Sequence, residues 1–178
     1  LHIRPNEENT FDLIDGQQRM TSITIMLSVI RDLLKDLDCI EESYAIHNQI
    51  STKPLGGETT HRLMPCAELK ENDFFAKFIQ NKNIEEIDPV NISQQHVIKN
   101  KKSFKTWIEE NLDSASTDYP DQLMSLAVKM TQSKIILIKV EHAEDAYKIF
   151  ESVNARGVDL SVADLLKNYL LTHIRETG

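Results

Sequence analysis

Five consecutive residues near the beginning of the chain carry groups that can bind and act on a phosphate: Asp15, Gly16, Gln17, Gln18 and Arg19. We call residues 15–19 the DGQQR turn. The guanidinium of Arg19 offers a planar fork of donors that suits phosphate or carboxylate. The carboxylate of Asp15 could hold Mg²⁺, which prefers hard oxygen ligands, and the amide of Gln17 or Gln18 could orient an attacking water. Gly16 would allow close approach of the backbone to a phosphate, because it has no side chain.

A strand and a helix would hold this turn in place. Residues 11–14 read as a short apolar strand. From residue 17 to about residue 38, apolar side chains recur at steps of three and four, which predicts an amphipathic helix. A helix N-terminus presents unpaired backbone N–H groups and the positive end of the macrodipole, so the turn would lie where an anion is favoured. A structural interpretation is also open, in which Asp15 is simply the N-cap of this helix.

A second polar junction lies near the other end of the chain, at residues 150–157. It follows a predicted helix over 144–153, and a further helix begins near Ser161. Ahead of it, the β-branched run at 134–140 predicts a strand that is buried on both faces. Between the two junctions, apolar periodicity predicts helices over 68–81, over 94–112 and from Pro120 onward.

The composition is that of an ordinary globular domain. Of the 178 residues, 40% are hydrophobic and 27% are charged, which is enough apolar material for a core of its own. The formal net charge of −8 argues against a protein that coats nucleic acid generally. A local basic site could still form at Lys99, Lys101, Lys102 and Lys105, although a lysine run on a helix is more often a solvated face.

Cysteine usage and hydropathy bear on the compartment. Cys39 and Cys66 lack CxxC spacing, so we expect two reduced thiols and a cytoplasmic location. No apolar run reaches the roughly 20 residues that span a membrane, so we expect no membrane partner. The chain opens on Leu1, within a predicted strand, so we expect a fragment that lacks an N-terminal segment.

Several common catalytic patterns are absent from the sequence. It contains no P-loop, GxGxxG or GxSxG motif, which excludes the usual phosphate-loop NTPase, Rossmann and serine-hydrolase patterns. The six histidines are scattered, without HExxH or HNH-like spacing, and no pair of carboxylates with a lysine indicates a nuclease site. We therefore expect no nuclease centre in this chain.

Taken together, the two polar junctions resemble the signatures of a known family, the GmrSD-type restriction endonuclease N-terminal domain family. The DGQQR turn with Met20 and Thr21 resembles that family's DGQQR-L-T signature at the start of a helix. Residues 150–171 resemble its second signature, in the same order and at a comparable distance. That signature reads Phe150-Glu151-x-x-Asn154-x-Arg156-Gly157-x-x-Leu160-Ser161-x-x-Asp164-Leu165-Leu166-Lys167-Asn168-Tyr169-Leu170-Leu171. Weaker intervening features are Arg62-Leu63-x-Pro65 and Phe104-x-x-Trp107-Ile108.

The resemblance implies a fold. Members of the family are similar to the ParB and sulfiredoxin superfamily, so the fold class we expect is α+β. It would combine a small mixed β-sheet with a large α-helical insertion and be predominantly helical overall. We expect one domain in three parts. They are a strand–turn–helix part at 1–66, a helical insertion at 67–131, and a strand–helix–loop–helix part at 132–178.

The resemblance also implies a function. The family's DGQQR segment is associated with nucleotide binding and hydrolysis in bacterial anti-phage restriction of modified DNA, with a C-terminal or separate nuclease domain as partner. It implies that Asp15, Gly16, Gln17, Gln18 and Arg19 form the nucleotide or phosphate site. Within that site, the side-chain chemistry described above makes Asp15, Gln17, Gln18 and Arg19 the expected catalytic residues, Gly16 and Arg19 the expected phosphate-binding residues, and Asp15 the expected Mg²⁺ ligand. The same resemblance implies a facing wall of the cleft made by Asn154, Arg156 and Lys167.

Two other functions are open from the sequence. In one, the same cleft is a non-catalytic sensor or DNA-binding module that controls a nuclease partner. In the other, the chain is an interaction scaffold, and Asp15 and Arg19 form an internal ion pair beside the helix start. The acidic net charge weighs slightly against tight duplex binding by this chain alone.

Overall fold

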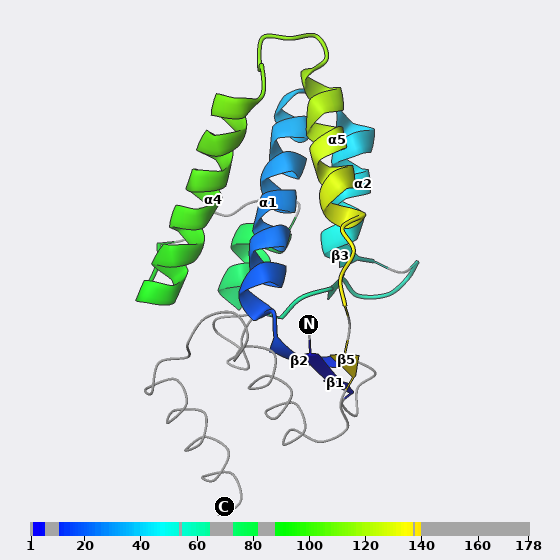
Figure 1. Cartoon of the computed structure of the whole chain (residues 1–178), viewed down its shortest axis with the longest axis vertical. Coiled ribbons are helices and arrows are strands. Elements are labelled where there is room, and N and C mark those ends of the chain that lie inside the picture. Colours follow the sequence, from blue (N-terminus) through cyan, green and yellow to red (C-terminus); the bar gives the residue numbers. More distant parts are fainter. Residues whose placement is uncertain are drawn as a thin grey trace, which may run out of the picture. The chain divides into compact units, whose positions relative to one another are not determined.

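The computed structural model describes residues 2–5, 11–53, 55–64, 73–81, 88–136 and 138–139 (Figure 1). The chain divides by its contacts into two units. Leu1–Gly16 with Ile135–Gly178 form one, which we call the sheet unit, and Gln17–Lys134 form the other, which we call the helical unit. The boundaries between these units differ from the boundaries at 66/67 and 131/132 that were predicted from the sequence. The single-domain organisation stays a prediction.

The sheet unit contains a small mixed sheet. Strands β1 (His2–Pro5) and β2 (Phe11–Asp15) are antiparallel neighbours, with His2 opposite Asp15. On the other side of β1 lies β5 (Ile138–Lys139), which runs parallel to it. Parallel and antiparallel pairs therefore meet on one strand, and the predicted mixed sheet is confirmed.

The strand predicted over 134–140 is shorter than expected within the described residues. Ile135 and Ile136 precede β5 in irregular backbone, and they are 62% and 80% exposed. The prediction that this run is buried on both faces is wrong at these two positions. A strand is buried on both faces where neighbours cover it, and the described pairing of β5 with β1 joins Ile138 and Lys139 to His2 and Ile3, not Ile135 or Ile136.

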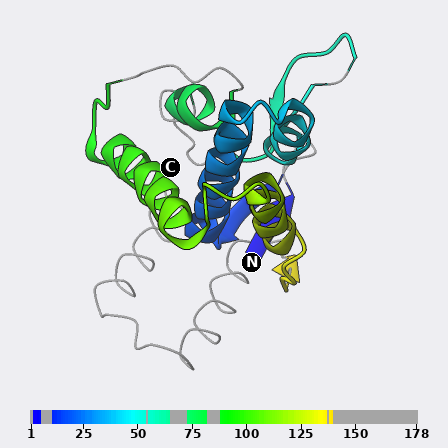
Figure 2. The same ribbon diagram turned by 90° about the horizontal axis from the view of Figure 1, so that it is seen from above.

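The helical unit is built around one helix. Helix α1 (Gln17–Asp36) contacts each of α2, η1, α4 and α5, and these four elements surround it when the ribbon is seen from above (Figure 2). The other elements in the described part of the unit include α2 (Ile40–Ile50), β3 (Ser51–Thr52), β4 (Thr60–His61), the π-helical turn η1 (Ala76–Gln80), α4 (Ile92–Asn111) and α5 (Tyr119–Thr131). The described chain is thus predominantly helical with small sheets, which confirms the predicted α+β class.

The apolar stripe of α1 forms the main core of the helical unit. Leu27, Ile30 and Leu34 are buried, and they pack with side chains of α2, α4 and α5. The predicted stripe extends too far, however, because α1 ends at Asp36 and Leu37 is 42% exposed. Asp38 has a φ of 61°, a left-handed conformation of the kind that ends helices.

Candidate functional site

Gly16 separates strand β2 from helix α1 in the chain, and its backbone conformation requires a glycine. Its φ is 92°, in the left-handed region that side chains with a Cβ rarely adopt. This conformation gives a backbone reason for the glycine, while the predicted role of Gly16 in close approach to a phosphate stays a prediction. Two consequences follow: the chain can pass abruptly from strand to helix here, and no Cβ stands over the start of α1.

The first turn of α1 has the properties of an anion-binding helix end. Gln17, Gln18 and Arg19 are exposed, and the first turn contains no acidic residue. A helix of 20 residues has a fully developed macrodipole, and its first N–H groups lack partners within the helix. An anion here would meet N–H donors and the positive end of the macrodipole, and the first helical turn itself carries no carboxylate that would repel it.

The remaining residues of the predicted site cannot be placed around this turn. Asp15 belongs to β2 by its backbone, but its side chain lies outside the described part of the structure. Asn154, Arg156 and Lys167 also lie outside the described residues. Gly16, Gln17, Gln18 and Arg19 are consecutive in the chain, and the site that they would form stays a prediction, as does the facing wall.

A second set of polar residues, of which the sequence analysis named only Lys101, lies inside the helical unit. Its centre is the carboxylate of Asp32 on α1. The Nε and Nη2 atoms of Arg31 lie 2.8 Å and 2.7 Å from Asp32 Oδ1, and Lys101 Nζ of α4 lies 3.0 Å from Asp32 Oδ2. Two cations therefore share one carboxylate, and one of them comes from a different helix. We call these three residues the buried ion cluster.

Arg31 connects the buried ion cluster to two further elements. Its side chain is 3% exposed, and its Nη1 donates to the carbonyl oxygen of Gln80 in η1 at 3.3 Å. The same Nη1 lies 3.5 Å from Nδ1 of His47 on α2. The backbone carbonyl of Arg31 in turn accepts from the hydroxyl of Ser43 at 3.0 Å. One guanidinium thus ties α1 to both α2 and η1.

Lys101 occupies an apolar setting for a cation. Its ammonium lies 4.8 Å from the centroid of the Phe78 ring and donates to the Phe78 carbonyl oxygen at 3.2 Å. Burial lowers the pKa of Lys101, and the neighbouring Asp32 carboxylate acts in the opposite direction. The expectation that the lysine run lies mostly in solvent is wrong for this lysine, whose side chain is 14% exposed.

The buried ion cluster is suited to holding helices together rather than to chemistry. Each oxygen of the Asp32 carboxylate already contacts a cation. Across the described ranges, no group of three or more His, Cys, Asp or Glu side chains could hold a metal ion. In the same part of the chain, no helix combines the length and apolar character needed to cross a membrane.

A histidine beside this region gives the helical unit a pH dependence. Nδ1 of His61 on β4 lies 2.7 Å from the hydroxyl oxygen of Ser51 on β3, which is fully buried. Burial lowers the pKa of His61 below 6.5. Because the unfolded chain then binds the proton first as the pH falls, the stabilising contribution is complete above pH 6.5 and is lost as the pH falls through the folded pKa.

We therefore expect the thermal midpoint to fall as the pH is lowered below about 6.5. A His61→Gln variant, which cannot take up this proton, should show a smaller fall over the same range. The measurement is a thermal melt of both proteins across this range. Parallel curves for the two proteins would show that other groups cause the pH dependence.

The comparisons with known proteins give one match. The family described as GmrSD restriction endonuclease, N-terminal domain, matches residues 2–171, which is nearly the whole chain. No curated protein and no solved structure matches this chain.

Proposed function

Because the chain belongs to the GmrSD restriction endonuclease N-terminal domain family, we propose that it is the nucleotide-binding and nucleotide-hydrolysing regulatory domain of an anti-phage restriction system acting on modified DNA. The observation that carries the nucleotide part is the start of α1. There, a left-handed glycine is followed by three exposed polar residues and a first turn without acids. This combination favours the phosphates of a nucleoside triphosphate.

The proposed roles follow from the chemistry of each side chain. The backbone N–H groups after Gly16 would receive the phosphates, and Arg19 would neutralise the charge that develops on the transferred group. Gln17 or Gln18 would orient the water that attacks the terminal phosphorus. The bond to the bridging oxygen then breaks, which yields a nucleoside diphosphate, inorganic phosphate and a proton.

The residue types of the turn would suit one magnesium ion. Proteins commonly hold Mg²⁺ with one or two carboxylates, the substrate phosphates and several waters. Asp15 would supply the carboxylate, and the ion would reduce the negative charge of the triphosphate. Asn154, Arg156 and Lys167 would add polar and cationic groups on the facing side. The nuclease partner, C-terminal or separate, would perform the cleavage of DNA.

The experiment is a thermal-shift titration of the chain with ATP, GTP, CTP and UTP, with and without Mg²⁺. A ligand at a hundred times its Kd stabilises a protein by about 2.7 kcal/mol, which is readily measured. We expect one nucleotide to give such a shift, and Arg19→Ala to abolish it. Arg62→Ala is the matched control, because it removes another exposed arginine of the helical unit.

Each outcome separates the functions that are open from the sequence. A shift that survives in Arg62→Ala and vanishes in Arg19→Ala supports the nucleotide site. An equal loss in both variants would point to a general effect of charge instead. The absence of a shift with all four nucleotides would contradict nucleotide binding by this chain and favour the non-catalytic sensor. Destabilisation of the ligand-free protein by Arg19→Ala alone, with no nucleotide effect, would favour the scaffold.

A further inference from the structure

The outer face of helix α4 concentrates positive charge on an acidic protein. No acidic residue occurs between Asp88 and Glu109, although the chain has 28 acidic and 20 basic residues. Within this stretch His96, Lys99 and Lys102 follow one another at intervals of three residues and are all exposed. At this interval side chains share one side of a helix, and the three residues extend over about 9 Å of its axis.

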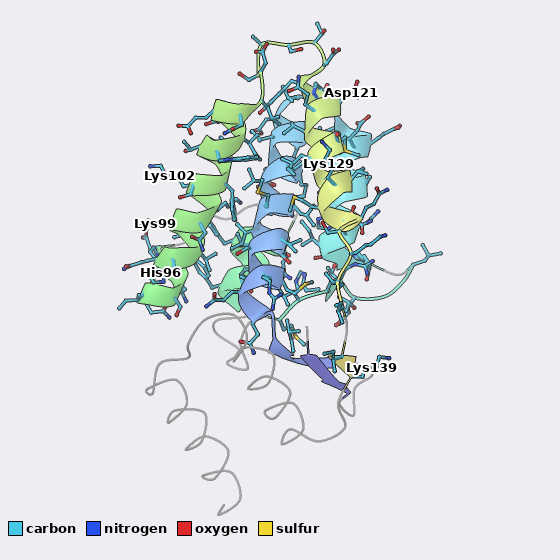
Figure 3. The ribbon with its side chains drawn as sticks, viewed as in Figure 1. His96, Lys99, Lys102, Asp121, Lys129 and Lys139 are labelled. Atoms are coloured by element: carbon cyan, nitrogen blue, oxygen red, sulfur yellow. The ribbon has the colours of Figure 1, made fainter. Side chains whose placement is uncertain are left out.

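The structure separates this outer face from the inward-turned lysine of the same run. Lys101 lies in the buried ion cluster, whereas His96, Lys99 and Lys102 project from the side of α4 that faces away from α1 (Figure 3). Within the described chain, no ion pair involves Lys99 or Lys102, while Lys105 lies 4.0 Å from Glu109. Asp32 cannot offset their charge, because its two oxygens already contact cations.

The neighbours of these cations add neutral hydrogen-bonding groups. Gln95, Asn100, Ser103 and Thr106 are exposed on the same part of the helix, between and beside the charged side chains. Lysines with flanking amides and hydroxyls are the usual partners of nucleic-acid phosphates, which protein side chains contact without reading the sequence. An ammonium on a flexible stem suits a phosphate as a point charge and imposes little geometry.

We propose that this outer face of α4 binds the sugar-phosphate backbone of duplex DNA. The choice of DNA rests on the proposed function in a DNA-restriction system, and the proposal adds where this chain holds the duplex. The contact positions the DNA and does not distinguish its bases. Recognition of the modified base therefore takes place elsewhere in the protein or its partner. The net charge of −8 predicts that the contact is weak and strongly salt-dependent.

The test is the salt dependence of binding to a short fluorescent DNA duplex, measured with the whole chain. Each phosphate neutralised contributes about −0.9 to the slope of log K against log salt. Lys99→Gln/Lys102→Gln should therefore reduce the magnitude of the slope by about 2 and weaken binding equally for unrelated sequences. The matched control is Lys53→Gln/Lys129→Gln, which removes the same charge from exposed positions outside α4. Lys129 lies on α5 (Figure 3).

The outcomes decide both proposals separately. Loss of slope in the α4 variant alone supports the DNA face. An equal loss in the control variant, or no duplex binding by the wild-type chain at low salt, would overturn it. Competition by polyglutamate as effective as that by unlabelled DNA would assign the face to an acidic protein and would also overturn it. Nucleotide shifts measured on the same variants test the DGQQR turn alone, because the α4 substitutions leave that turn intact.

Discussion

Replacing Asp32 by alanine is expected to lower the free energy of unfolding by about 3 kcal/mol. The substitution leaves two cations, Arg31 and Lys101, in the interior without the carboxylate that they share. Uncompensated buried charge is what makes the loss of one member of a buried ion pair costly. Asp32 keeps 17% of its side-chain surface exposed, which places the effect at the lower end of the range for such pairs.

Chemical denaturation of the unchanged chain and of four variants would measure this effect. Asp36→Ala is the matched control, since it removes a carboxylate from an exposed position in the last turn of the same helix. It should change stability by less than about 0.5 kcal/mol. Lys101→Met replaces the ammonium with an apolar group beside Phe78. The double variant Asp32→Ala/Lys101→Met should lose less free energy of unfolding than the sum of the two single losses. The difference, which is the coupling free energy, should be roughly 0.5–3 kcal/mol.

Additive losses in the double variant would show that the two residues act independently, and that the buried ion cluster does not join α1 to α4. An equal effect of Asp32→Ala and Asp36→Ala would show that burial of the cluster has no energetic consequence. Either result would remove the structural explanation of why a lysine lies inside this fold.

The position of Lys101 shows what sequence periodicity can and cannot provide. The helix predicted over 94–112 has its apolar face at Val97, Phe104 and Ile108, and Lys101 lies four residues after the first and three before the second. The position of Lys101 on the inner face could therefore be predicted from the sequence. Its pairing with Asp32 could not, because Asp32 belongs to another helix, and nothing local in the sequence indicates which helices pack together.

The strands show a different limit. β-branched residues at Ile135 and Ile136 are typical of a buried strand, yet both are exposed, because burial depends on a neighbouring strand rather than on propensity. The DGQQR turn was predictable in its backbone, since an Asp-Gly pair before an amphipathic helix requires an abrupt turn, and Gly16 has the positive φ that explains the glycine. Its chemistry could be assigned only by resemblance to a family.

Replacing Arg19 by lysine tests that chemistry more sharply than removing the side chain. If the DGQQR turn hydrolyses a nucleoside triphosphate, lysine keeps the positive charge at the start of α1, so nucleotide binding should change little. The planar fork, which would meet two oxygens of the transferred phosphoryl group, is lost, because an ammonium is a single point charge. Removal of one such preorganised donor typically lowers kcat by about 10²–10³-fold.

We therefore expect Arg19→Lys to give a thermal shift with nucleotide close to that of the unchanged chain, while phosphate release falls by about 10²–10³-fold. Arg62→Lys should change neither quantity, because Arg62 lies in the exposed segment after β4, where its side-chain Nε donates to the Asn48 carbonyl oxygen at 3.1 Å. Loss of binding in Arg19→Lys would mean that the fork acts in the ground state. Undiminished phosphate release would exclude Arg19 from the transition state, and hydrolysis would then depend on the other residues of the turn.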